Sequence, residues 1–136
     1  MKKIFVALLV VLLLFTVGCQ RKMAKVDTLE EKVVITITGD VNEDISLFDY
    51  MLQMKENGEI EFTYSNGQFG AYILSINDIT AKTTEFWGLY TDDEEFSSIE
   101  WGQVEYKEKI YASSSLGCEG LKVKKGKTYI WVLTKV

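Results

Sequence analysis

The sequence predicts an α+β fold in which a single helix packs on a mainly antiparallel sheet. Three observations support this prediction: a β-branched run at residues 33–38, apolar residues at helical spacing within 46–56, and a series of apolar stretches from residue 60 onward. One strand, one helix and then a run of strands is an order typical of α+β domains. We therefore expect one folded domain, over residues 32–136.

The helix is predicted over residues 46–56. Asp44 or Ser46 can cap its N-terminus, because short polar side chains accept a hydrogen bond from the free amides of the first turn. Asn57-Gly58 is a natural helix end, since both residues tolerate left-handed backbone. The apolar face of the helix then consists of Leu47, Phe48, Met51, Leu52 and Met54.

Most of the remaining apolar stretches are expected to form strands. Residues 33–38 (VVITIT) have strong β propensity and end at Gly39-Asp40. Residues 60–64 alternate apolar and polar and are expected to close on a Ser65-Asn66-Gly67 turn. Further strands are expected at 69–76, with Tyr72, Leu74 and Ile76 on one face, at 86–90, at 103–111, around 121–123, and at 128–134 after a turn over 124–127.

The N-terminus predicts a lipoprotein signal in residues 1–18. Two lysines precede the apolar run 4–17, and Gly18-Cys19 follows it. This 14-residue run is too short to cross a hydrocarbon core of ~30 Å comfortably but is typical of a secretory h-region. The segment 15–19 (FTVGC) resembles a lipobox, although Thr16 stands where that motif usually has leucine.

Acylation of Cys19 would anchor the chain at the extracytoplasmic face of the cell membrane. The alternatives are an ordinary secretory cleavage site, for which residues 16–18 are a poor match, and a transmembrane anchor, which needs a longer apolar run. Each buried methylene of a palmitate-like chain contributes about 0.8 kcal/mol, so two or three chains make a stable anchor. Residues 19–31 are expected to be the lipidated cysteine and a short tether.

Composition excludes several classes of function. The chain from Cys19 onward has 118 residues, with 13 basic and 20 acidic side chains, which give it a net charge of −7. Such a domain repels phosphate backbones, so we expect no nucleic-acid partner. The chain has no histidine, the commonest general base and transition-metal ligand. It also lacks a P-loop, a dinucleotide fingerprint and a nucleophile elbow, so we expect no enzyme activity.

Four segments together resemble the domain family DUF4430, which is related to the C-terminal domain of transcobalamin and intrinsic factor. They are SLFDYMLQ (46–53), FGAYILSIND (69–78), EFWGLYTDD (85–93) and KVKKGKTYIWVLT (122–134), and the resemblance covers roughly residues 45–136. It implies a β-grasp-like domain in an exported protein. In the animal relatives this domain helps to enclose cobalamin together with a helical barrel. That barrel is missing here, so a corrinoid would meet only one wall.

Aromatic residues in the middle of the chain are the candidate ligand site. Trp87, Tyr90, Trp101 and Tyr111, with Tyr106 nearby, could form a platform for a planar or sugar-like ligand. The alternative is that they are buried in the core, where aromatic rings bury large areas. Trp87 matches the tryptophan of the family's FWxLY-like segment.

Two further features are expected to have no functional role. The acidic run 92–95 (DDEE) could bind Ca²⁺, but it lacks the spacing of a calcium loop and is expected to be a solvated loop. Cys118 has no histidine to make it a nucleophile and is expected to be a small packing residue. We therefore expect no metal site.

Three functions compete. The first is a membrane-tethered, non-catalytic ligand-binding or accessory domain for uptake of a cofactor or other small molecule, with a concave site near Trp87 and Trp101. The second is a protein-interaction or surface-adhesion module, which would show an exposed apolar patch or an open strand edge. The third is a metal-binding lipoprotein that uses residues 92–95. A transporter or surface protein is the expected protein partner.

Overall fold

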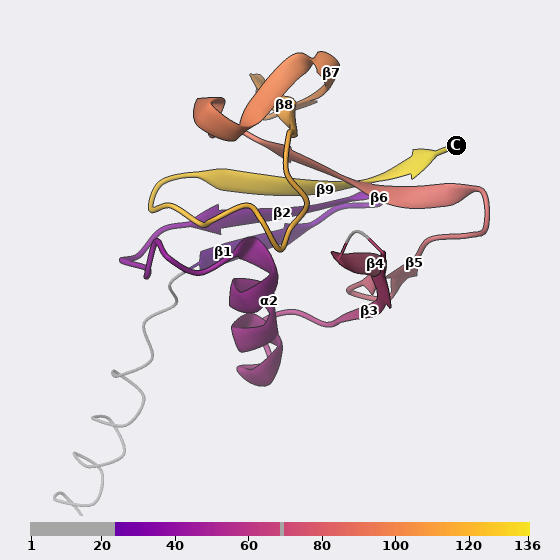
Figure 1. Ribbon diagram of the computed structural model, residues 1–136, viewed down its shortest axis with the longest axis horizontal. Coiled ribbons are helices and arrows are strands. Elements are labelled where there is room, and N and C mark those ends of the chain that lie inside the picture. Colours follow the sequence, from indigo (N-terminus) through magenta and orange to yellow (C-terminus); the bar gives the residue numbers. More distant parts are fainter. Residues whose placement is uncertain (1–23, 69) are drawn as a thin grey trace, which may run out of the picture.

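The fold class predicted from the sequence is confirmed. The computed structural model describes residues 24–68 and 70–136, so the predicted signal and Cys19 lie outside the described residues. Within that part, one α-helix, α2 (Leu47–Glu56), packs on a mainly antiparallel sheet (Figure 1). No helix among these residues has the length and apolarity needed to cross a membrane.

The described strands form two antiparallel sheets. The larger has the order β1-β2-β9-β6-β8-β7, and every recorded pair in it is antiparallel, including β2 with the C-terminal strand β9. The smaller has the order β3-β4-β5. The strands are β1 (Ala24–Thr28), β2 (Lys32–Ile37), β3 (Phe62–Gly67), β4 (Gly70–Ile76), β5 (Ile79–Thr80), β6 (Glu85–Thr91), β7 (Ser97–Tyr106), β8 (Lys109–Ser114) and β9 (Thr128–Lys135).

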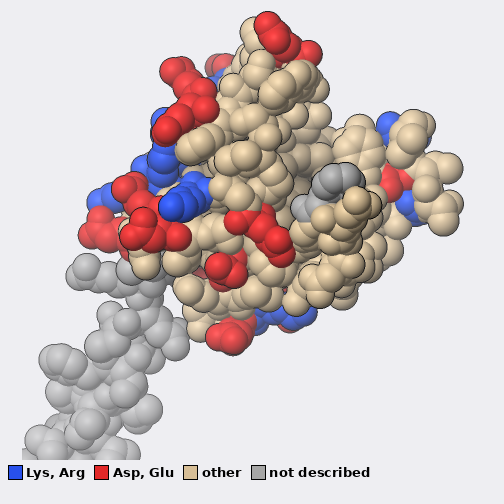
Figure 2. Space-filling model, in the orientation of Figure 1, with Lys and Arg blue, Asp and Glu red and all other residues tan. Residues whose placement is uncertain are grey.

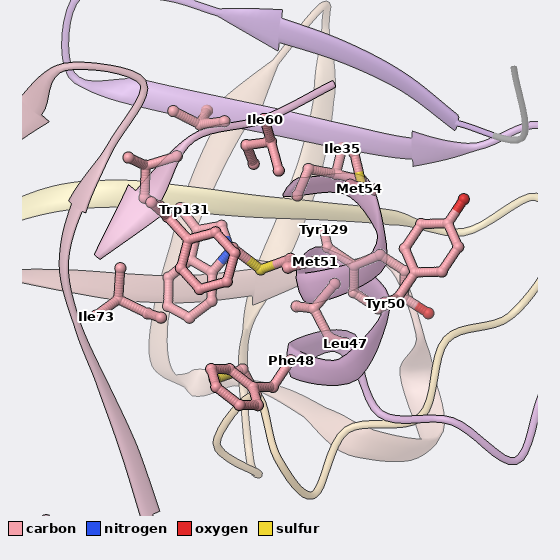
Figure 3. Packing of buried hydrophobic residues seen from close by; sticks show 14 of the residues in the cluster. Ile35, Leu47, Phe48, Tyr50, Met51, Met54, Ile60, Ile73, Tyr129 and Trp131 are labelled. Carbon is pink, nitrogen blue, oxygen red and sulfur yellow. The ribbon is translucent and has the colours of Figure 1, made fainter. Parts of the chain in front are cut away.

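The helix begins and ends as predicted. Of the two candidate caps, Ser46 is the N-cap, and its Oγ accepts a hydrogen bond from the Asp49 amide at 3.1 Å. Asn57 is the C-cap. The buried face of α2 meets the large sheet, where Met51 lies among core side chains that include Trp131 (Figure 3).

The large sheet is covered on both faces. α2 and the small sheet lie on one side of it, and the β7–β8 hairpin lies on the other (Figure 1). On the hairpin side, Tyr111 packs with Val34 and Ile130 in a second, smaller core. The tip of the hairpin reaches across to the far edge strand, where the Tyr106 hydroxyl donates to Asp27 of β1 at 2.5 Å.

The tether predicted over 19–31 is wrong for its C-terminal part. Residues 24–28 are strand β1, paired with β2 from Ala24↔Ile37 to Thr28↔Val33. Ala24 is buried, and Val26 packs against the main core. The mixed charges of this segment concealed an edge strand, in which only alternate residues need to be apolar.

The strand predicted over 103–111 is also wrong, because the chain reverses inside it. Lys107 and Glu108 both have positive φ and form the two-residue turn of the β7–β8 hairpin. Such turns favour Asn-Gly or Asp-Gly, so Lys-Glu gave no turn signal.

Three smaller expectations need correction. Residues 65–67 are not a turn but the last part of β3, which continues to Gly67, and Gly67 pairs with Gly70. On β4, Ile73 and Ile76 are buried while Tyr72 and Leu74 are exposed, because a register shift at Thr63/Tyr64 changes the alternation. Residues 121–123 form no strand, only a bridge between Ser46 and Lys122. The strands expected at 33–38, 86–90 and 128–134 are confirmed as β2, β6 and β9.

Candidate functional site

The four aromatic residues chosen from the sequence do not form one platform. Trp87 is buried on the helix side of the large sheet, whereas Tyr111 is buried on the hairpin side and Tyr90 packs beside it. Trp101 is 65% exposed on β7. The structure therefore places these residues in three different environments, and only Trp87 borders a concave site.

That concave site is a groove between the two sheets, which we call the β4–β6 groove. It has a volume of about 360 Å³, within the range of small-ligand sites. None of its lining side chains is charged. The lining residues are Ala71, Tyr72 and Ile73 of β4, Phe86, Trp87, Gly88 and Leu89 of β6, Ser113, Ser114, Ser115, Leu116, Gly117 and Cys118 at and after the end of β8, and Trp131 of β9.

The groove exists because two strands lack a neighbour there. β8 pairs with β6 at Tyr90 and Thr91 alone, so within the described chain residues 85–89 have no strand partner on that side. β5 likewise pairs only with the C-terminal end of β4. At one end the two strands are joined by a hydrogen bond of 3.3 Å from Trp87 Nε1 to the Leu74 carbonyl.

Four residues of the lining are buried members of the main core: Ile73, Trp87, Cys118 and Trp131. Cys118 is buried, and burial raises the pKa of its thiol to about 11, so the group is an unreactive thiol at neutral pH. This agrees with the expected packing role. Trp131 is also buried, and its Nε1 has no hydrogen-bond partner among the residues that the structure describes.

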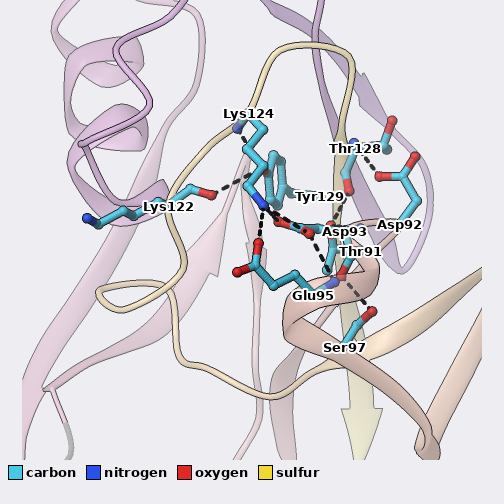
Figure 4. A network of polar contacts seen from close by, with 9 residues as sticks. All are labelled: Thr91, Asp92, Asp93, Glu95, Ser97, Lys122, Lys124, Thr128 and Tyr129. Carbon is cyan, nitrogen blue, oxygen red and sulfur yellow. Dashed lines mark hydrogen bonds and ion pairs between the residues drawn. The ribbon is translucent and has the colours of Figure 1, made fainter.

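The acidic run is only in part the solvated loop that we expected, since Glu94 and Glu95 are exposed while Asp92 and Asp93 are not. Asp92 accepts hydrogen bonds from the Thr128 amide and from Lys109, and Asp93 is buried with its carboxylate 3.0 Å from Lys124 Nζ (Figure 4). Lys124 also pairs with Glu95 at 2.9 Å. These carboxylates fasten the end of β6 to the turn before β9, a pairing that the sequence order could not reveal.

Lys124 is the centre of this network. Hydrogen bonds to Glu95 and Asp93 raise its pKa to about 12, so it stays charged at neutral pH. Its backbone amide donates to the Tyr129 hydroxyl at 2.9 Å. No group of three or more potential metal-ligating side chains occurs within the described ranges, and the carboxylates of Asp92, Asp93 and Glu95 are engaged by lysines and a backbone amide instead.

A second exposed feature is a bulge in β7. Ser98 pairs with Ser113 and Gln103 with Ala112, so four residues of β7, 99–102, stand opposite no residue of β8. Gly102 closes this bulge with φ of +133°, a conformation that favours glycine. Ile99 and Trp101 are each 65% exposed on it.

Sequence reasoning missed most of the β4–β6 groove. The serines at 113–115 and the β4 residues gave no chemical signal, because the groove consists of backbone edges and uncharged side chains. Figure 2 shows the densest group of charged side chains at the left of the visible face, with others at its top, right and lower edges.

No protein-family model matches the chain, and no curated protein matches it.

Adjacent lysines allow a test of the buried ion pair. Lys124→Met should lower the free energy of unfolding by about 2 to 3 kcal/mol, because it leaves the Asp93 carboxylate buried without its partner. Lys125→Met is the control, since its pair with Asp40 is exposed (side chains 58% and 90% exposed), and should leave the free energy of unfolding nearly unchanged. Urea denaturation measures both, and equal losses would contradict a structural role for Asp93.

Proposed function

We propose that this chain is a lipid-anchored, non-catalytic binding domain on the extracytoplasmic face of the membrane, with the β4–β6 groove as its ligand site. The observation that carries the proposal is the groove itself: an uncharged cavity of about 360 Å³, lined by aromatic rings and serines and bordered by two strand edges. The residues offer binding surface but no arrangement of nucleophile and base.

The anchoring part of the proposal rests on the sequence. The apolar run 4–17 followed by Gly18-Cys19 supports lipidation at Cys19. The described domain begins with the paired strand β1 at Ala24, so at most a few residues separate it from the acylated cysteine. Membership of the DUF4430 family, with a corrinoid as a candidate ligand, is part of this proposal and rests on the four segments alone.

A second candidate function has its own observation in the β7 bulge. Ile99 and Trp101, which are two residues apart in sequence, are both exposed on a segment that no described strand residue opposes. Tryptophan is enriched among residues that dominate protein interfaces. This favours a protein-interaction module that uses the bulge as its contact.

Anchoring is tested through the two cysteines. Metabolic labelling with a palmitate analogue should label the wild-type chain and Cys118→Ala, while Cys19→Ala should incorporate no label, because Cys19 alone precedes the domain at the signal boundary. Mass spectrometry of the purified chain checks the site. A wild-type chain without acyl groups would overturn the anchoring proposal.

Ligand binding in the groove is tested by thermal unfolding of the full chain in detergent. The panel contains a corrinoid, a tetrapyrrole, oligosaccharides and short uncharged peptides. A ligand at 100 times its Kd should stabilise the fold by about 2.7 kcal/mol, a shift of several degrees. Leu116→Arg puts a charge on the groove wall and should abolish the shift, while Leu29→Arg, at a residue of similar exposure (41% against 38%), should not. No shift with any compound would count against the groove.

The bulge is tested by photo-crosslinking in the cell. A photoreactive amino acid in place of Trp101 should give a crosslinked band with a defined protein, whereas the same residue in place of Leu29 should not. An absence of crosslinks at Trp101, or the same crosslinks at both positions, would remove the interaction-module candidate.

A further inference from the structure

The geometry points to an extended, uncharged polypeptide segment as the ligand of the β4–β6 groove, bound as an added strand along the free edge of β6. This inference rests on the proposed function, since it names the ligand class of the same site. It is argued from the shape of the lining, the direction of the free backbone groups and the absence of charge.

The lining shows that the groove contacts the edges of the strands. Successive side chains of a strand point to opposite faces, so a cavity on one face would contact alternate residues. The groove instead contacts four consecutive residues of β6, 86–89, and three of β4, 71–73. Only the edge of a strand presents consecutive residues to one space, and an edge presents backbone N–H and C=O groups.

Hydrogen bonding on β6 identifies which groups are free. The Val136 amide donates to the Thr84 carbonyl at 2.8 Å, and hydrogen-bonded pairs alternate along an antiparallel ladder. Residues 86, 88 and 90 therefore bond to β9, and the backbone groups of Trp87 and Leu89 point to the other side. The groove begins on that side, because β8 pairs with β6 only at Tyr90 and Thr91 and then leaves the sheet.

The position of β8 defines the place of the ligand in the sheet. Ser113 still pairs with Tyr90, and the chain then turns away through residues 114–118, which line the groove. A peptide beside residues 85–89 would thus occupy the place that β8 vacates. Main-chain hydrogen bonds of this kind give affinity in strand addition, and pockets for alternate side chains give selectivity.

The lining also selects the side chains of the peptide. None of the fourteen lining residues is charged, so a charged side chain would lose water without gaining an ionic partner. Cys118 and Trp131 offer an apolar floor to one set of alternate side chains, while the exposed Tyr72 and Phe86 border the groove. A segment of alternating small apolar and uncharged polar residues matches this surface.

The test uses the full chain in detergent micelles and a capped hexapeptide of alternating valine and threonine. Two analogues carry N-methyl groups on alternate residues, which block one or the other edge of the peptide. We expect the parent to bind and to slow hydrogen exchange at the Trp87 and Leu89 amides at least tenfold, as measured by NMR. The analogue methylated on the edge that faces β6 should bind at least tenfold more weakly, whereas the other analogue should bind like the parent, because only one edge of the peptide pairs with β6.

The outcomes separate this inference from the proposed function. Binding of the peptide that both N-methyl patterns affect equally, or that leaves the Trp87 and Leu89 amides unprotected, would overturn strand addition. A peptide that fails while a corrinoid or sugar binds in a manner sensitive to Leu116→Arg would also overturn it, and the proposed function would stand. If neither peptide nor panel compound binds, both fail. Leu29→Arg remains the matched control throughout.

Discussion

The packing of β9 at the centre of the large sheet is the interaction on which the rest of the structure depends. β9 pairs with β2 on one side and with β6 on the other, so it joins the N-terminal hairpin to the second half of the chain. Its side chains serve both cores: Tyr129 and Trp131 meet the helix layer, and Ile130 meets the hairpin layer. The Tyr129 hydroxyl accepts a hydrogen bond from the Lys124 amide, and Trp131 lines the groove. This strand therefore positions both the polar network and the candidate site.

The groove is a consequence of how the sheet covers its second face. The β7–β8 hairpin leaves β6 after two paired residues and folds over Val34 and Ile130, where Tyr111 buries its ring. That apolar contact leaves part of the β6 edge without a partner. Free edges are normally blocked because they recruit other strands. Here the edge lies in a recess walled by β4 and the 113–118 segment, which restricts access to it.

Particular elements show how far sequence reasoning reached. The strand β2, the helix and β9 were predicted because β-branched runs, helical spacing and capping residues are local signals. β1 was missed because its apolar residues are only Ala24 and Val26, and the hairpin turn at 107–108 was missed because Lys-Glu is an unusual pair for positive φ. Among the site residues, Trp87 borders the groove, while Tyr90 and Tyr111 belong to the opposite face and Trp101 to the bulge.

The sequence by itself determined the class of fold, the predicted export signal and the acidic, histidine-free chemistry of the domain, since these follow from local pattern and composition. Only the tertiary structure decided that Asp93 is buried against Lys124, that the middle aromatics divide between two faces, and that β4 and β6 leave their edges open to one groove. These features depend on pairing between residues far apart in the chain. A strand edge is made of backbone, and backbone carries no signal in the sequence.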